Sequence, residues 1–175
     1  MRDNPQAYGT LSRFFHWFMA LLLLWQLASV VARVLLKDSS IDKFLWATHK
    51  PLGALLLLLV AVRIIWTLIN LSRRPASINF LAKLGHLTLY LLLFAVPALG
   101  LARQYGSGRA FDVFGIPLFS GFEGKIEWLM TPGNLLHGNL GWILFALIVG
   151  HILMVIVHRK AKGHVDVLPR MWGKK

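Results

Sequence analysis

Residues Leu136–Arg159, LHGNLGWILFALIVGHILMVIVHR, decide how this chain folds. Between His137 and His158 the only polar side chains are Asn139, near one end, and His151. The stretch therefore has the length and composition of one membrane-spanning helix. At about 100° per residue, the three histidines fall within a stripe about 60° wide, and at about 1.5 Å rise His137 and His151 lie about 21 Å apart in depth. Two histidines at different depths on one helix face indicate two stacked cofactors.

The composition is that of an integral membrane protein with a single domain, residues 1–175. Of the 175 residues, 57% are hydrophobic, which is too many for an ordinary soluble domain, and the chain is too short for a second bundle. The absence of cysteine excludes disulfides, iron–sulfur clusters, thiolate haem ligation and covalent haem attachment. Any metal chemistry must use the seven histidines. The net charge is +12, and the charged residues cluster beside the hydrophobic spans. This placement indicates membrane lipid, and not nucleic acid, as the partner.

Four apolar runs predict an all-α bundle of four transmembrane helices, at about residues 14–36, 45–71, 80–101 and 136–159. The first run could be mistaken for a signal sequence, but it is long enough for a full span and no A-x-A-like cleavage site follows it. Residues 72–79, SRRPASIN, form a tight turn. The connection 102–133 is longer, with a possible short helix at 123–130. It is expected either to cap the bundle at headgroup level or to roof an outer cofactor.

The lysines and arginines predict the orientation of the bundle. The richer side carries Arg2, Arg13, Arg73, Arg74, Lys83, Arg159, Lys160, Lys162, Arg170, Lys174 and Lys175. The other side carries Arg33, Lys37, Lys43, Lys50, Arg103, Arg109 and Lys125. Because positive charge accumulates on the cytoplasmic side of membrane proteins, both termini are predicted to be cytoplasmic.

On this topology six histidines form two layers. His49 and His137 lie toward the outer surface, and His16, His86, His151 and His158 lie toward the cytoplasm. Ionisable side chains within spans are costly, so a shared cofactor explains six of them better than separate interhelical hydrogen bonds do. A zinc or copper ion would draw three or four histidines into one compact cluster. Two outer histidines suit an axial pair on a haem between facing helices.

The outer pair, His49 and His137, shares a local pattern. Each histidine is followed four residues later by a glycine, Gly53 or Gly141, one turn deeper on the same helix face. Such a glycine leaves room for a porphyrin beside the backbone. Plain helix packing through small residues is the competing explanation.

The inner pair is less determined, because His151 can face either His16 or His86. Arg63 lies fourteen residues after His49, the same step that separates His137 from His151. It therefore reaches the inner layer on nearly the ligand face of its helix. There it is expected either to pair with a haem propionate or to snorkel to the cytoplasmic surface.

Taken together, these motifs resemble the bacterial cytochrome b561 family, whose relatives include the cytochrome b subunits of membrane hydrogenases and formate dehydrogenases. The matching pieces, which cover nearly the whole chain, are Arg13-x-x-His16-Trp17, His49-x-x-x-Gly53 with Arg63-x-x-Trp66, His86-x-x-x-Tyr90 with Pro97, and His137-x-x-x-Gly141 with His151, His158 and Leu168-Pro169-Arg170-Met171. Each motif alone is weak, but their order and topology are specific.

The resemblance implies two b haems with axial ligands from the first, second and fourth helices. On this chain that assigns His16 and His151 to the inner haem, and His49 and His137 to the outer haem. It leaves His86 and Arg13, with Arg63, as candidates for propionate binding or packing.

Haem with two histidine ligands has no open position at iron and passes single electrons, so the predicted function is electron transfer across the bacterial inner membrane. Ubiquinone is the expected inner partner. His158 lies two turns beyond His151 on the same stripe and is a candidate to bind and protonate the quinone, with Ser77 in the inner turn as a second donor. The competing interpretation of His158 is a surface imidazole among lipid headgroups.

Two candidate functions differ in the electron donor at the outer end of the bundle. Superoxide oxidase members of the family imply superoxide as the donor, and Lys50, Arg103, Arg109 and Lys125 are candidates to attract this anion. Alternatively, the chain is an electron-transfer subunit docked to a peripheral dehydrogenase or hydrogenase, although it has little sequence beyond its spans for docking. A structural bundle without a cofactor is the third reading.

Overall fold

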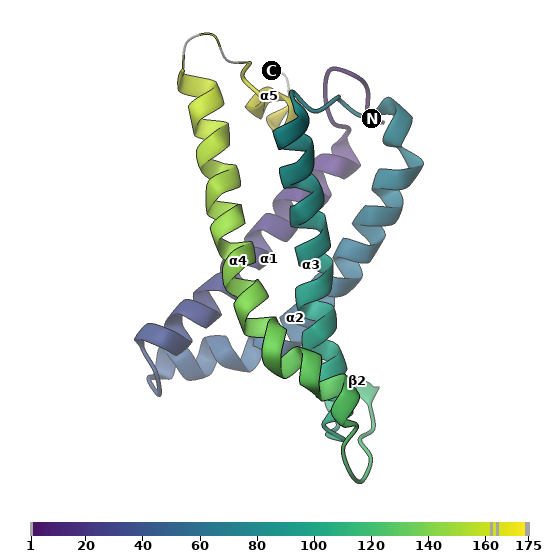
Figure 1. Ribbon diagram of the computed structural model, residues 1–175, viewed down its shortest axis with the longest axis vertical. Helices are drawn as coiled ribbons and strands as arrows, with labels where there is room; N and C mark the ends of the chain where they lie inside the picture. The colour runs from purple at the N-terminus through teal and green to yellow at the C-terminus, as the bar shows by residue number, and fades with distance from the viewer. Residues whose placement is uncertain (1, 162, 164, 174–175) are drawn as a thin grey trace.

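The computed structural model describes residues 2–161, 163 and 165–173, and four long helices dominate them (Figure 1). These helices are α1 (Thr10–Leu35), α2 (Ser40–Ile69), α3 (Phe80–Gly106) and α4 (Glu127–Lys160). Each is long and apolar enough to cross a membrane. The predicted four-span helical bundle is therefore confirmed. Three of the charges used to predict orientation, Lys162, Lys174 and Lys175, lie outside the described residues.

Side-chain caps define the starts of α2 and α3. The side chain of Ser39 accepts a hydrogen bond from the Asp42 amide, and that of Asn79 accepts one from the Ala82 amide. Both satisfy amides that have no partner within the first helical turn. Between α2 and α3 the chain forms a single turn of 3₁₀ helix, η1 (Leu71–Arg73), within the predicted inner turn.

The fourth helix differs most from its predicted bounds. It begins at Glu127, nine residues before Leu136, and includes the second half of the short helix expected at 123–130. It continues through Pro132, although proline removes a backbone hydrogen bond. The next residue, Gly133, packs closely on α3, since a Cβ there would lie 2.8 Å from the Leu99 carbonyl oxygen.

The connection between α3 and α4 contains a hairpin that the sequence analysis does not predict. Strands β1 (Phe111–Val113) and β2 (Ile116–Phe119) pair antiparallel. The turn residues Phe114 and Gly115 have φ of 52° and 85°, the positive values of a two-residue hairpin turn. The hairpin lies at the end of the bundle opposite the termini (Figure 1), so it occupies the place expected for a cap or roof.

A short helix, α5 (Leu168–Trp172), closes the other end of the bundle. The Tyr8 amide donates to the Arg170 carbonyl, and the Arg170 guanidinium donates to the Ala76 carbonyl. These bonds tie the beginning and the end of the chain to the turn between α2 and α3. Both ends of the described chain therefore lie at one end of the bundle (Figure 1). Which membrane side this end faces stays a prediction from the charges.

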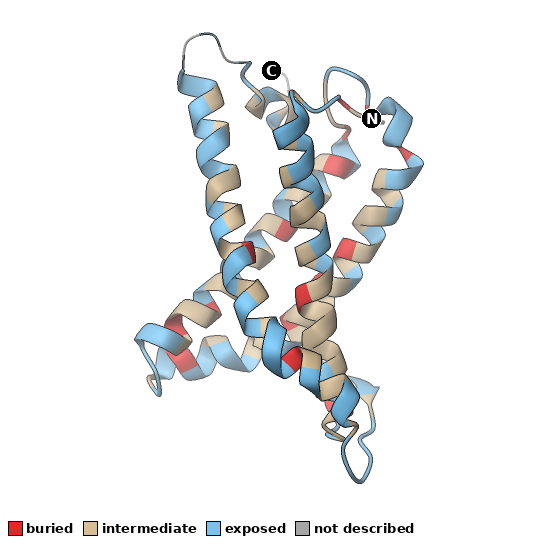
Figure 2. Cartoon of the chain, in the orientation of Figure 1, coloured by how far each residue is buried: buried red, intermediate tan, exposed pale blue. Residues whose placement is uncertain are grey.

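The surface and packing of the bundle suit a lipid environment. Large apolar side chains are exposed along all four long helices, and few residues are fully buried (Figure 2). Extensive contacts join α1 to α2, α2 to α3, and α3 to α4. The pairs α1–α4 and α2–α4 are not among these extensively packed pairs. Each predicted ligand pair joins one of these loosely packed helix pairs: His16 and His151 join α1 to α4, and His49 and His137 join α2 to α4.

Candidate functional site

The outer layer joins His49 of α2 to His137 of α4. Their ring centroids lie 6.2 Å apart, with an angle of 81° between the planes. The Trp46 ring stacks on His49 at 4.6 Å, and the Arg33 guanidinium lies 5.0 Å from the Trp46 centroid. The predicted outer pair is thus brought together, within a layer that also holds an indole and a cation.

The Nδ1 atom of His49 is held by α1. It lies 2.9 Å from the Ser29 hydroxyl, which donates its own hydrogen to the Gln26 carbonyl at 2.6 Å. The Gln26 side-chain nitrogen donates to the backbone carbonyl of His49 at 3.0 Å and also lies 3.1 Å from His49 Nδ1. Ser29 and Gln26 were not found by sequence reasoning, because small polar residues within a span carry no motif of their own.

The Nδ1 atom of His137 is held by α3. It donates to the Val96 carbonyl oxygen at 2.8 Å, since a carbonyl can only accept. The His137 ring lies across Gly100, where a Cβ would come within 2.8 Å of the ring carbon Cε1. The two glycines singled out in the sequence, Gly53 and Gly141, have more space around them than Gly100 does. A Cβ on Gly53 would meet only Gln26, at 3.6 Å, and a Cβ on Gly141 would meet nothing within 4 Å.

The inner layer contains both candidate partners of His151. The ring centroid of His16 on α1 lies 6.3 Å from that of His151, and the ring centroid of His86 on α3 lies 5.6 Å from it. His86 is also hydrogen-bonded to the backbone of Ala82, and its side chain is exposed, whereas His16 and His151 are half-buried.

Arg63 lies within the inner layer and not at the surface. Its Nη2 atom is 3.3 Å from His16 Nδ1, and its Nη1 atom is 3.9 Å from the Met19 sulfur. The guanidinium carbon also lies 5.4 Å from the centroid of the Tyr90 ring. Of the two expectations for Arg63, this position favours binding to a propionate in the inner layer over snorkelling to the cytoplasmic surface.

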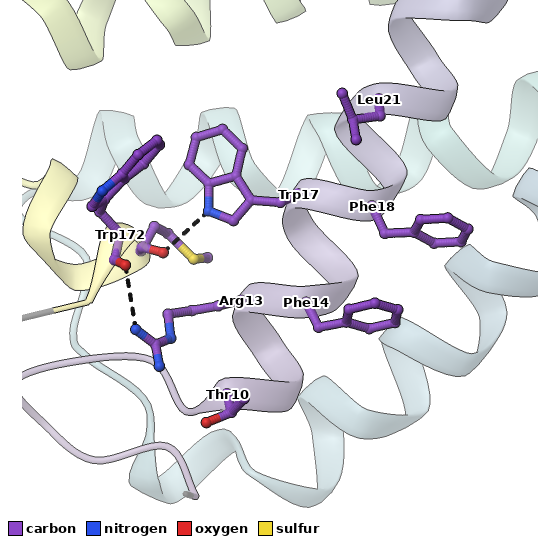
Figure 3. A pocket seen from close by; sticks show the side chains of 8 residues that line it. Thr10, Arg13, Phe14, Trp17, Phe18, Leu21 and Trp172 are labelled. Carbon is purple, nitrogen blue, oxygen red and sulfur yellow. Dashed lines mark hydrogen bonds between the residues drawn. The ribbon is translucent and has the colours of Figure 1, made fainter.

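Arg13 has a different position from Arg63. Its Nη1 donates to the Trp172 carbonyl at 3.4 Å, and the neighbouring Trp17 indole donates to the Met171 carbonyl at 3.2 Å (Figure 3). These bonds attach α5 to α1, and Arg13 and both tryptophans line a shallow groove of about 420 Å³. Phe14 and Phe18 point away from α5 (Figure 3). Arg13 therefore packs α5, and the structure does not bring it to the histidines.

The quinone candidates lie toward the end of the bundle that holds the termini. His158 Nδ1 donates to the Met154 carbonyl at 2.7 Å, and the His158 side chain is half-buried. Ser77 is exposed in the turn between α2 and α3. The structure records no direct bond that joins these two residues within the described part of the chain.

The cationic candidates lie at the hairpin end. Lys50 donates to the Gln104 side-chain oxygen at 2.9 Å, and the Gln104 amide donates to the Arg109 carbonyl at 3.5 Å. Arg103 is one residue from Gln104, whereas Lys125 lies farther along the connection. The two ion pairs recorded among the described residues, Arg33–Asp42 and Arg74–Asp3, do not include these cations. Gln104, which joins the Lys50 side chain to the Arg109 backbone, was missed by the sequence analysis.

The arrangement suits axial pairs better than a compact metal site. No group of three or more His, Cys, Asp or Glu residues that could hold an ion occurs within the described residues. With metal–nitrogen bonds of about 2 Å, and about 1.2 Å from nitrogen to ring centre, two imidazoles on opposite sides of one ion have centroids about 6.4 Å apart. The spacings of 6.2 and 6.3 Å match this value, whereas the 5.6 Å between His86 and His151 is shorter.

Paired imidazoles at two depths of a four-span bundle are the arrangement of a membrane cytochrome b. A family model described as prokaryotic cytochrome b561 matches residues 7–174. The chain belongs to this family and is a membrane electron carrier. Family membership implies that it binds haem b, and the chemistry and spacing of the histidines fit that group.

Two curated relatives match over nearly their full length. Cytochrome b561 homolog 2 of Escherichia coli (strain K12) is 29% identical, over 98% of this chain and 94% of the relative. A protein of Yersinia pestis named probable superoxide oxidase CybB is 25% identical, over 97% of this chain and 98% of that protein. The second name suggests oxidoreductase activity in this group of sequences.

Proposed function

We propose that the chain transfers electrons across the bacterial inner membrane, from superoxide at the periplasmic surface to ubiquinone in the membrane, by way of two b haems. The observation that carries this proposal is the pair of histidine contacts at two depths, His49 with His137 and His16 with His151. In the balanced reaction two superoxide anions become two O₂, and ubiquinone takes up two electrons and two protons to become ubiquinol.

The axial ligands are proposed to be His49 and His137 for the outer haem, and His16 and His151 for the inner haem. A haem held by two histidines has no open coordination position and supplies one-electron transfer without binding a substrate at iron. The step of fourteen residues from His137 to His151 corresponds to about 21 Å along α4, which is most of the roughly 30 Å hydrocarbon core. His86 and Arg63 remain in the inner layer as packing or propionate-binding residues.

The hairpin end supports a small anionic donor. Lys50 follows the ligand His49 directly, so its charge lies beside the outer layer. The Lys50 ammonium bonds to the Gln104 side chain, Arg103 precedes Gln104 on α3, and the Arg109 backbone accepts from Gln104. None of these three cations forms a recorded ion pair within the described residues. Clustered charge of one sign raises the local concentration and the on-rate of an oppositely charged substrate.

At the other end, His158 and Ser77 are proposed to contact the quinone. With Nδ1 of His158 donating to Met154, the neutral imidazole has its lone pair on Nε2. At Nε2 an imidazole in that tautomer can accept a hydrogen bond from a quinol hydroxyl. The proposed position at the membrane edge gives it access to the cytoplasmic water from which the two protons of ubiquinol would come.

The direct test is to purify the full chain and count its haems. Two bis-histidine haems per chain, reduced by superoxide and reoxidised by added ubiquinone, would support the proposal. Haem that superoxide fails to reduce would reject superoxide as the donor. If a partner dehydrogenase or hydrogenase reduced the protein instead, the chain would be an electron-transfer subunit.

Orientation is tested separately. A fluorescent protein that folds only in the cytoplasm, fused after the last residue, is expected to fluoresce because the lysines and arginines favour the cytoplasmic side for both termini. Fluorescence from a fusion within the hairpin 111–119, with none from the terminal fusion, would invert the proposed direction of electron flow.

A further inference from the structure

We infer that Ser29 and Gly100 are positioning residues for the outer haem, because they fix the ring orientation and the tautomer of its two proposed ligands. Neither residue contacts the other, and they act from different helices, α1 and α3. The inference rests on the proposed ligation by His49 and His137, and it adds two residues that no motif or relative assigns.

The argument for Ser29 starts from its single hydroxyl hydrogen. The side chain is fully buried, and the short 2.6 Å contact to the Gln26 carbonyl requires that hydrogen, since the carbonyl cannot donate. The 2.9 Å contact with His49 Nδ1 is then a hydrogen bond only if Nδ1 carries the proton. In that tautomer the Gln26 side-chain nitrogen, 3.1 Å from the same Nδ1, gives its hydrogen to the His49 backbone carbonyl instead. In a neutral imidazole this leaves the lone pair on Nε2, the atom that a metal can bind.

The same tautomer follows for His137 from a backbone acceptor. The Val96 carbonyl lies 2.8 Å from Nδ1 and can only accept, so Nδ1 is the protonated atom. The ring reaches this carbonyl by lying against Gly100. A Cβ at residue 100 would lie 2.8 Å from Cε1 and 3.0 Å from Nδ1, closer than real side chains approach a rigid ring.

At His16 of the inner layer no acceptor is recorded on Nδ1 within the described residues. The group recorded there is the Arg63 guanidinium, which donates and carries a positive charge. An acceptor on Nδ1–H makes a histidine ligand more basic and favours the more highly charged, oxidised metal, whereas a nearby cation disfavours it. Ser29 and the Val96 carbonyl should therefore lower the midpoint potential of the outer haem relative to the inner haem.

The first experiment compares Ser29→Ala with Ser12→Ala in the purified, haem-loaded protein. Ser12 is also a buried α1 serine with two side-chain hydrogen bonds, but its partners are Asp3 and Trp66. Ser29→Ala is expected to raise the outer midpoint potential and to weaken outer haem binding by about 10- to 100-fold. Ser12→Ala should leave both properties of the outer site unchanged. Ser29→Thr, which keeps an acceptor, should restore the potential.

The second experiment compares Gly100→Ala with Gly106→Ala. A Cβ at residue 106 would also crowd α4, at 2.9 Å from the Leu129 Cβ and 3.0 Å from the Ile126 carbonyl oxygen, but it would touch no histidine. Gly100→Ala is expected to bind one haem per chain, and Gly106→Ala two. A His49→Ala protein, which lacks an outer ligand, gives the reference spectrum for loss of the outer haem.

The results separate this inference from the proposed function. An unchanged outer potential in Ser29→Ala, together with two normal haems in Gly100→Ala, would overturn the positioning role and leave electron transfer standing. Loss of the same haem in Gly106→Ala would reduce the effect of Gly100 to general helix packing. A wild-type protein that holds two haems but ignores superoxide would reject the donor and leave the positioning role intact.

Discussion

Arg63 is the residue whose placement most affects the inner layer. It is a charged side chain inside a membrane span, and it contacts His16, Met19 and Tyr90 rather than the aqueous edge. Such a residue is expected to serve a bound group or a partner of opposite charge. Its recorded neighbours are neutral, and under the proposed haem ligation an anionic propionate would supply the opposite charge.

Replacing Arg63 with glutamine should lower the midpoint potential of the inner haem. Loss of a positive charge near the layer favours the oxidised state, and a shift on the order of 50 mV corresponds to about tenfold in a one-electron equilibrium. Spectroelectrochemical titration of the holoprotein measures this. Arg13→Gln is the matched control, because Arg13 contacts α5 and not the histidines. Equal shifts in both variants would contradict a specific role for Arg63.

At the scale of elements, the bundle is built from two kinds of helix contact. Glycine brings α3 and α4 together, because a Cβ on Gly133 would lie 2.6 Å from the Arg103 Cβ and 2.8 Å from the Leu99 carbonyl oxygen. By contrast, the helices that carry each ligand pair are not extensively packed on one another. Besides this tight contact with α3, the α4 histidines also reach His49 on α2 and His16 on α1.

Gly133→Ala tests the tight contact. Forcing a methyl group between these backbones should cost about 1–3 kcal/mol, as overpacking does in well-packed interiors. Thermal unfolding in detergent should show a lower midpoint. Gly138→Ala is the control on the same helix, since a Cβ at that exposed position would meet nothing within 4 Å. Equal stability of the two variants would show that α4 can shift to accommodate the methyl group at little cost.

At the scale of the whole molecule, the two ends of the bundle are chemically different. The hairpin end brings Lys50 and Arg109 to Gln104, and the opposite end gathers both termini, α5 and His158. The two histidine pairs lie between these ends. If a small anion donates electrons at the hairpin end and a lipid-soluble acceptor takes them up at the opposite end, electrons would flow through the molecule in one direction.

Lys50→Gln should slow reduction of the holoprotein by superoxide by several-fold at low ionic strength, and added salt should shrink the difference, because screening weakens steering by exposed charge. Stopped-flow absorbance of the haem measures the rate. Lys43→Gln is the control, since Lys43 is exposed at the start of the same helix but seven residues from Lys50. A salt-independent loss in Lys50→Gln would indicate a local contact instead of steering.

Much of the fold could be predicted because the membrane imposes simple rules. A span must satisfy its own backbone hydrogen bonds, so long apolar runs become helices. Their bounds were less predictable, since caps and packing extend a helix beyond its apolar part. The hairpin at 111–119 escaped prediction because its strands are short and its turn, Phe114-Gly115, is not a common hairpin pair.

The sequence by itself determined the four-helix class, the family and the spacing of His137 and His151, since hydropathy and helical period depend on local composition. Only the tertiary structure placed Arg63 against His16, brought both His16 and His86 to His151, and set Ser29 beside His49 and Gly100 beside His137. Those contacts join residues far apart in the chain, and whether they form depends on how closely each helix approaches its neighbour. Helical periodicity fixes the face of a residue, whereas helix packing decides what that face meets.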